Sequence, residues 1–138
     1  MLRILLVEDD PDRERCLTSM LPADVRTVVA RSAGVAIGVL ARDPGRVYAG
    51  VILDHDLQQC AMTDADRLLS GQDVVNAIVQ HVNRAVPILI HSMNTTQRGV
   101  MAAILERAGY EVTTIPASVL DSSALSRWLN SVRENQDE

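Results

Sequence analysis

Short apolar runs alternate with amphipathic stretches along the chain. Five runs are rich in Val, Ile and Leu, and each is followed by a segment whose apolar residues recur at helical spacing. The runs predict strands at residues 2–7, 25–30, 48–53, 86–90 and 110–115. Strands that are apolar at nearly every position, and that alternate with helices, are typical of a parallel sheet with helices on both faces.

Capping residues mark where several predicted helices begin. Asp10 stands before Pro11, which favours the first helical turn, and Ser32 can cap the second helix. Ser70 and Asp73 have the spacing of a capping box, in which each side chain accepts a hydrogen bond from the other residue's backbone N–H. These signals place a helix after each of the first three predicted strands.

The predicted elements form a single domain over residues 1–138. We expect an α/β three-layer sandwich built around one parallel sheet. A polar stretch at about 58–69 is expected to be a loop insertion. The last helix is expected to begin at Asp121 or Ser122 and to end in a frayed tail at 134–138. In such sheets ligands bind beyond the carboxyl ends of the strands.

The composition excludes several classes of protein. Hydrophobic residues make up 47% and charged residues 22% of the chain, which argues against disorder. No apolar run approaches the roughly 18 residues that a membrane span needs. A net charge of −5, no Lys and only three aromatic residues argue against extended DNA or RNA binding, whereas a compact phosphate ligand fits.

The two cysteines and the amino terminus add little. Cys16 and Cys60 lack the spacing of a zinc site or a disulfide framework. The first apolar run is too short for a signal peptide and leads directly into acidic residues. We therefore expect a cytoplasmic protein.

Acidic and other polar residues follow three of the five predicted strands. They are Glu8 and Asp9 after the first, Asp54, His55 and Asp56 after the third, and His91 and Ser92 after the fourth, with Asn94 and Arg98 shortly behind. If these strands are adjacent, their four carboxylates converge in one pocket. Like charges so close need compensation, and Mg²⁺ (or Mn²⁺) prefers carboxylate and carbonyl ligands. The sequence therefore predicts a metal site.

Three segments resemble the receiver domain of two-component response regulators. They are residues 5–11 (LLVEDDP), 51–54 (VILD) and 87–92 (PILIHS). The resemblance covers nearly the whole chain and implies a flavodoxin-like (βα)5 fold with the parallel sheet in the order 2-1-3-4-5. It implies that Glu8 and Asp9 are the metal-binding acid pair and that Asp54 is the phospho-acceptor. It also implies that the backbone carbonyl of Asp56 is a metal ligand and that the Ser92 hydroxyl contacts the phosphoryl group.

Departures from ordinary receivers point to an offshoot. The Lys expected before the Pro that follows strand five is replaced by Ile115, the aromatic position nearby is Val112, and the loop after Asp54 is longer than usual. The motifs LDHDL at 53–57 and HSMN at 91–94, followed by Arg98, resemble the cyclic-phosphate-processing receiver family. This resemblance implies a cyclic phosphate substrate, of the nucleotide or RNA-end type.

The chemistry of such a substrate suggests roles for the polar residues. Opening a cyclic phosphodiester needs a nucleophile, neutralisation of negative charge and a proton donor. His55 or His91 could exchange protons near neutral pH, and Arg98 could bind phosphate oxygens in place of the missing Lys. Asn94 and the start of the following helix offer hydrogen-bond donors to an anion.

The same residues also have ordinary structural explanations. Asn94 can be a helix cap, His91 a core histidine and Arg98 a solvated helix residue. The leading hypothesis is a Mg²⁺-dependent hydrolase of a cyclic phosphate. One alternative is a receiver that accepts phosphate on Asp54 from a kinase or a small phosphodonor. Another is a pseudo-receiver that acts only through binding a protein partner.

Overall fold

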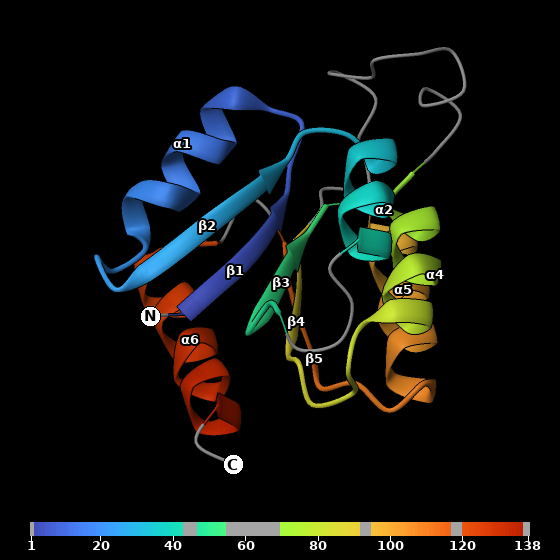
Figure 1. Cartoon of the computed structure of the whole chain (residues 1–138). Helices are drawn as coiled ribbons and strands as arrows, with labels where there is room; N and C mark the ends of the chain where they lie inside the picture. Colours follow the sequence, from blue (N-terminus) through green and yellow to red (C-terminus); the bar gives the residue numbers. More distant parts are fainter. Residues whose placement is uncertain (1, 43–46, 55–69, 92–94, 117–119, 137–138) are drawn as a thin grey trace.

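The computed structural model (Figure 1) describes residues 2–42, 47–54, 70–91, 95–116 and 120–136. Within these ranges five parallel strands form one sheet in the order β2-β1-β3-β4-β5. The strands are β1 (Leu2–Val7), β2 (Val25–Ala30), β3 (Gly50–Leu53), β4 (Ile88–His91) and β5 (Val112–Ile115). The predicted strand order and the flavodoxin-like α/β class are confirmed.

Helices cover both faces of the sheet. Those described are α1 (Pro11–Met20), α2 (Ala33–Arg42), α4 (Gly71–His81), α5 (Thr95–Arg107) and α6 (Ser122–Gln136). Helices α1 and α6 lie on one face, and α2, α4 and α5 lie on the other, which gives the three layers of the sandwich (Figure 1). In the ranges above, none of the helices combines the length and the hydropathy needed to cross a membrane.

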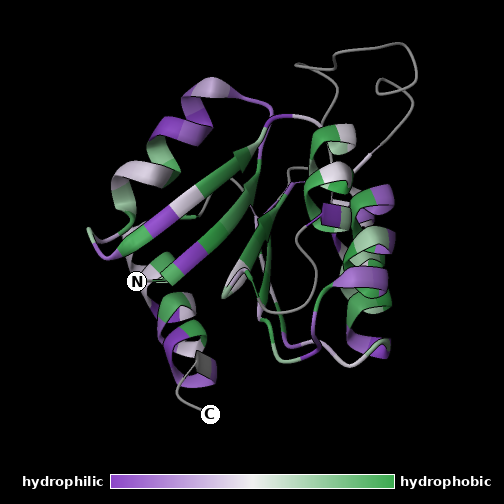
Figure 2. Cartoon of the chain, viewed as in Figure 1, coloured by the Kyte–Doolittle hydropathy of each residue, from purple (hydrophilic) through white to green (hydrophobic). Residues whose placement is uncertain are grey.

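Side chains of the central strands alternate between two hydrophobic cores. In β1, Ile4 and Leu6 belong to the cluster that contains Trp128 of α6. Leu5 and Val7 belong instead to the cluster beneath α2, α4 and α5. The alternation follows from the two-residue period of a strand, and it explains why hydrophobic residues run along the strands in Figure 2. Packing on both faces holds each central strand in place, and with it the polar residues that follow its carboxyl end.

The predicted caps are present at α1 and α4. The Asp10 side chain accepts hydrogen bonds from backbone N–H groups of the first turn of α1, including that of Arg13. Ser70 and Asp73 form the capping box of α4. The Asp10 cap holds the first turn of α1 directly behind the end of β1, so Arg13 lies at the carboxyl edge of the sheet. The cap predicted at Asn94 lies outside the described residues.

Three strands begin later than the sequence predicts. Strands β3, β4 and β5 begin at residues 50, 88 and 112 rather than 48, 86 and 110, and β4 continues to His91. Before β5, the Tyr110 hydroxyl lies 2.8 Å from the backbone oxygen of Ile78 and 2.6 Å from that of Val82. These contacts hold Tyr110 against the end of α4, so the chain joins the sheet only afterwards.

The last helix ends later than predicted. It continues to Gln136, so the tail that was expected to fray from residue 134 is helical up to that point. Arg133 binds both carboxylate oxygens of Asp24 at 2.6 and 3.0 Å, and Asn135 Nδ2 lies 3.3 Å from Glu111 Oε2. These contacts tie the helix end to the segments that precede β2 and β5. The insertion predicted at 58–69 and residues 137–138 lie outside the described residues.

Candidate metal centre

Three acidic side chains meet at the carboxyl edge of the sheet. Glu8 and Asp9 follow β1, and Asp54 follows β3, the neighbouring strand. The last residues of these two strands are paired in register, so the acids lie at the same level. One carboxylate oxygen from each acid lies within 4.8 Å of the others, and all three residues are buried. The structure thus brings together three of the four carboxylates expected to converge, and the fourth, Asp56, lies outside the described residues.

Burial changes the protonation of Glu8. Desolvation, followed by the negative charge of Asp54, raises the pKa of Glu8 from 4.5 to about 8, although Arg13 acts in the opposite direction. Glu8 Oε2 is also a buried oxygen without a hydrogen bond in the described part of the chain. A buried carboxylate oxygen that lacks a donor, beside two further acids, fits a divalent cation with oxygen ligands.

Arg13 is a site residue that the sequence analysis misses. Its Nε lies 3.3 Å from Glu8 Oε1, and its Nη2 lies 3.5 Å from Asp54 Oδ2. The guanidinium therefore bridges acids that follow two different strands. The sequence holds one signal for this contact: a helix capped by Asp10 begins directly after the acid pair, so a basic residue in its first turn stays beside the acids.

His91 ends β4 and points into the same centre. Its Nε2 lies 3.4 Å from Glu8 Oε2, and its side chain is 1% exposed. Burial, and to a smaller extent the positive charge of Arg13, lowers the pKa of His91 from 6.5 to about 4, so the imidazole is neutral at pH 7. His91 Nε2 has no hydrogen bond in the described part of the chain. A proton on Glu8 Oε2 would join these two atoms in the metal-free protein.

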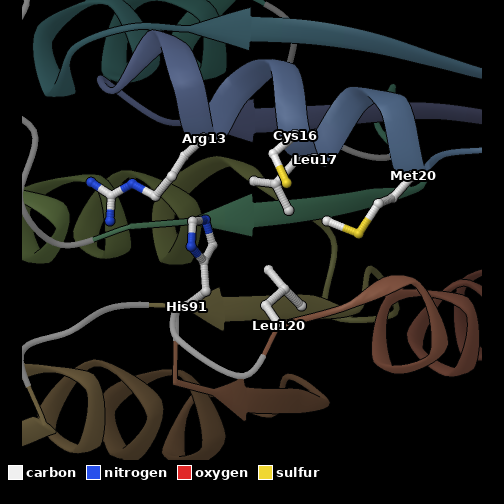
Figure 3. Close-up of a pocket in the computed structure, with 6 residues that line it drawn as sticks. All are labelled: Arg13, Cys16, Leu17, Met20, His91 and Leu120. Carbon is white, nitrogen blue, oxygen red and sulfur yellow. The ribbon is translucent and has the colours of Figure 1, made fainter.

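A small cavity adjoins the acidic centre. Figure 3 shows Arg13 reaching from α1 on one side and His91 from the end of β4 on the other. The cavity has a volume of about 50 Å³ and is lined by Arg13, Cys16, Leu17, Met20, His91 and Leu120. Because Arg13 and His91 contact the acids and also line the cavity, a largely apolar space lies directly beside the carboxylates.

The structure leaves the roles of the other predicted site residues untested. Four of them lie outside the described ranges, and their roles stay predictions: His55, Asp56, Ser92 and Asn94. Arg98 is half-buried in the first turn of α5, and its role as a phosphate clamp also stays a prediction. Ile115, at the position where ordinary receivers carry Lys, packs against the core between the sheet and α6.

The sheet order, the acid pair after β1 and the aspartate after β3 together define a receiver-type domain. The family model described as "Cyclic-phosphate processing Receiver domain" matches residues 3–107. The chain belongs to this family of receiver domains. A comparison with curated proteins gives no match.

Solved receiver structures share the fold at low sequence identity. The chain is similar to the receiver domain of sensor histidine kinase PA1611 from Pseudomonas aeruginosa PAO1, whose structure has a magnesium ion coordinated in the active site cleft. The identity is 22%, the TM-score is 0.69, and the match covers 96% of this chain and 98% of that one. A CheY-like receiver domain protein from Methanospirillum hungatei JF-1 is 15% identical, with a TM-score of 0.73 and coverage of 99% and 98%.

The metal-free protein should lose stability as the pH rises from 6.5 to 8. The pKa of Glu8 in the folded protein is raised, so its contribution is complete below pH 4.5 and is lost as the pH approaches 8. The pKa of His91 is lowered, so its contribution is lost only as the pH falls from 6.5 toward 4. Thermal melting with a chelator present should therefore show a falling Tm between pH 6.5 and 8.

Two comparisons make this pH dependence specific to the acidic centre. Glu8→Gln should flatten the Tm profile between pH 6.5 and 8, because the amide does not titrate. Added Mg²⁺ should raise the Tm of the unmodified protein more at pH 8 than at pH 6.5, since a smaller fraction of the molecules then carries a Glu8 proton that binding must displace. A Tm that rises with pH in the chelated protein would contradict the prediction.

Proposed function

We propose that this chain is a Mg²⁺-dependent hydrolase of a cyclic phosphate, of the nucleotide or RNA-end type. The observation that carries the proposal is the buried cluster of Glu8, Asp9 and Asp54 in a chain that belongs to the cyclic-phosphate processing receiver family. The magnesium ion coordinated in the PA1611 receiver domain adds support for the choice of metal.

Hydrolysis of a cyclic phosphate replaces one ester bond of the ring by a bond to water. Water oxygen bonds to phosphorus, one of the two ester P–O bonds of the ring breaks, and the released oxygen takes a proton, so that a phosphate monoester forms. Glu8, Asp9 and Asp54 would hold the ion, which when bound neutralises phosphate charge and activates a water molecule. The residues of the chain must then bind the anion, exclude bulk water and move protons.

His91 is the described residue best suited to proton transfer. Its lowered pKa keeps the imidazole neutral at pH 7, so the ring nitrogen that carries no hydrogen can accept a proton from the attacking water. His55, the other histidine predicted to exchange protons, would then give a proton to the leaving oxygen. The cavity between α1 and β4 lies beside the acids and leaves room for a small part of the substrate's organic skeleton.

Turnover of 2′,3′-cyclic AMP tests the proposal directly. Purified protein with Mg²⁺ should produce a phosphate monoester, visible by ³¹P NMR, and excess EDTA should stop the reaction. His91→Gln should lower kcat by about 100-fold, the usual contribution of a general base. His81→Gln is the matched control, because His81 lies at the far end of α4, and it should leave kcat unchanged. Absence of Mg²⁺-dependent product from a panel of cyclic phosphates would overturn the proposal.

A second candidate function is phosphate acceptance in signalling. It is favoured by the position of Asp54 at the end of β3, beside the acid pair, as the receiver resemblance implies for a phospho-acceptor. Incubation with acetyl phosphate and Mg²⁺ would then add one acid-labile phosphoryl group, detected by intact-protein mass spectrometry and absent in Asp54→Asn. A third outcome would indicate a pseudo-receiver that binds a protein partner. In that case the protein would not hydrolyse cyclic phosphates, would not accept phosphate and would not gain stability from Mg²⁺.

A further inference from the structure

We propose that Arg13 is the phosphate-binding cation of this site and takes the role that a Lys has in ordinary receivers. The inference rests on the magnesium site of the proposed function. In the metal-free protein, Arg13 is the internal counter-ion of Glu8 and Asp54. When a divalent ion binds these acids, the guanidinium turns to the non-bridging oxygens of the phosphate ligand.

The geometry of Arg13 is that of a loosely held counter-ion. Its contacts with Glu8, Asp54 and Asp10 measure 3.3, 3.5 and 3.6 Å. Charge-assisted hydrogen bonds are typically about 2.7–2.9 Å long, so these are ion pairs without a close bidentate bond. Arg13 Nε is a buried nitrogen with no hydrogen bond in the described part of the chain. The guanidinium therefore has donors left to offer to an anion.

The charges of the centre leave a place for both a metal ion and a phosphate. With Glu8, Asp9 and Asp54 ionised, the three negative charges and the one positive charge of Arg13 sum to about −2. A divalent cation neutralises that sum. The carboxylates of Glu8 and Asp54 then bind the ion rather than Arg13, which is left with only its long 3.6 Å contact with Asp10. A phosphate ligand bound to the ion would provide an anion for Arg13 to contact.

Further observations support a ligand at this centre and Arg13 as the cation that contacts it. Glu8 Oε2 and His91 Nε2 are buried, lie 3.4 Å apart and have no hydrogen bond in the described part of the chain, so the centre has unused ligand atoms. The sequence contains no Lys, and Ile115 packs in the core where ordinary receivers place that residue. Arg13 is 36% exposed, which leaves its side chain free space on the solvent side of the acids.

The test measures two affinities in one variant. Arg13→Gln should bind Mg²⁺ more tightly, by about fivefold or more, because the positive charge that pairs with Glu8 and Asp54 is removed. With Mg²⁺ at saturation, the same variant should bind inorganic phosphate about tenfold more weakly, because a charged donor is lost. Isothermal titration calorimetry measures the first affinity, and ³¹P NMR titration measures the second.

The opposite changes expected in Mg²⁺ affinity and phosphate affinity distinguish this role of Arg13 from a purely structural one. Arg15→Gln is the matched control, because Arg15 lies on the same helix, pairs with exposed Asp12 and carries the same charge; it should change each affinity by less than about twofold. Arg13→Lys should restore part of the phosphate affinity. If Arg13→Gln weakens both affinities, or changes neither, the inference is wrong. These readouts need no turnover, so a protein that lacks hydrolase activity can still confirm the role of Arg13.

Discussion

Asp54→Asn should abolish turnover and lower Mg²⁺ affinity by at least about 100-fold. Loss of even an outer-shell partner of a metal costs 10- to 100-fold in affinity, so the loss of a direct carboxylate ligand should cost at least that much. In the metal-free protein the same change should raise the Tm at pH 8, because one of three clustered negative charges disappears and the pKa of Glu8 falls. Calorimetric titration with Mg²⁺ and melting with a chelator present measure the two effects.

Lost Mg²⁺ binding together with gained stability would identify Asp54 as a metal ligand. A residue that merely supports the fold would lower both Mg²⁺ affinity and Tm. Asp24→Asn serves as the control, because Asp24 is exposed and pairs with Arg133 far from the centre. It should leave Mg²⁺ affinity unchanged. Unaltered Mg²⁺ binding in Asp54→Asn would remove Asp54 from the site.

Gly50→Ala should destabilise the protein by about 1–3 kcal/mol, the usual cost of overpacking a core. A Cβ atom at this position would lie 2.8 Å from Trp128 Cη2, closer than Cβ atoms approach other atoms, and 3.1 Å from Val132 Cγ2, which is tighter than most Cβ contacts. Trp128 is 3% exposed and belongs to the core cluster beneath α6, so a shift of its rigid indole would disturb that packing. Urea denaturation should show a lower midpoint with an unchanged slope.

Two controls isolate the contact between β3 and α6. Gly38→Ala lies within α2, where an added Cβ meets no atom within 4 Å, and it should stabilise the helix by about 0.5–1 kcal/mol. Trp128→Phe removes the ring atoms nearest to Gly50, so Gly50→Ala should cost less in that background. Equal costs in the two backgrounds would show that the close approach to Trp128 is not the cause.

Local features of the sequence were sufficient to predict the elements and the fold class. Strands buried on both faces must be apolar at nearly every position, so their number and approximate places could be predicted from the pattern of apolar runs. The caps at Asp10 and Ser70 were predictable because they depend on residues only a few positions apart. Strand beginnings were less accurate, since the contacts of Tyr110 with the end of α4 join residues about 30 positions apart.

For the site, the sequence by itself determined that acids end two central strands and that no Lys is present to bind phosphate. Adjacent parallel strands bring their carboxyl ends together, so the meeting of Glu8 and Asp54 could be foreseen. Only the tertiary structure decided that Arg13 bridges those acids and that His91 faces Glu8. The direction of each side chain depends on how α1 packs against the sheet and how β4 lies beside β3, and these long-range contacts leave no periodic signal in the chain.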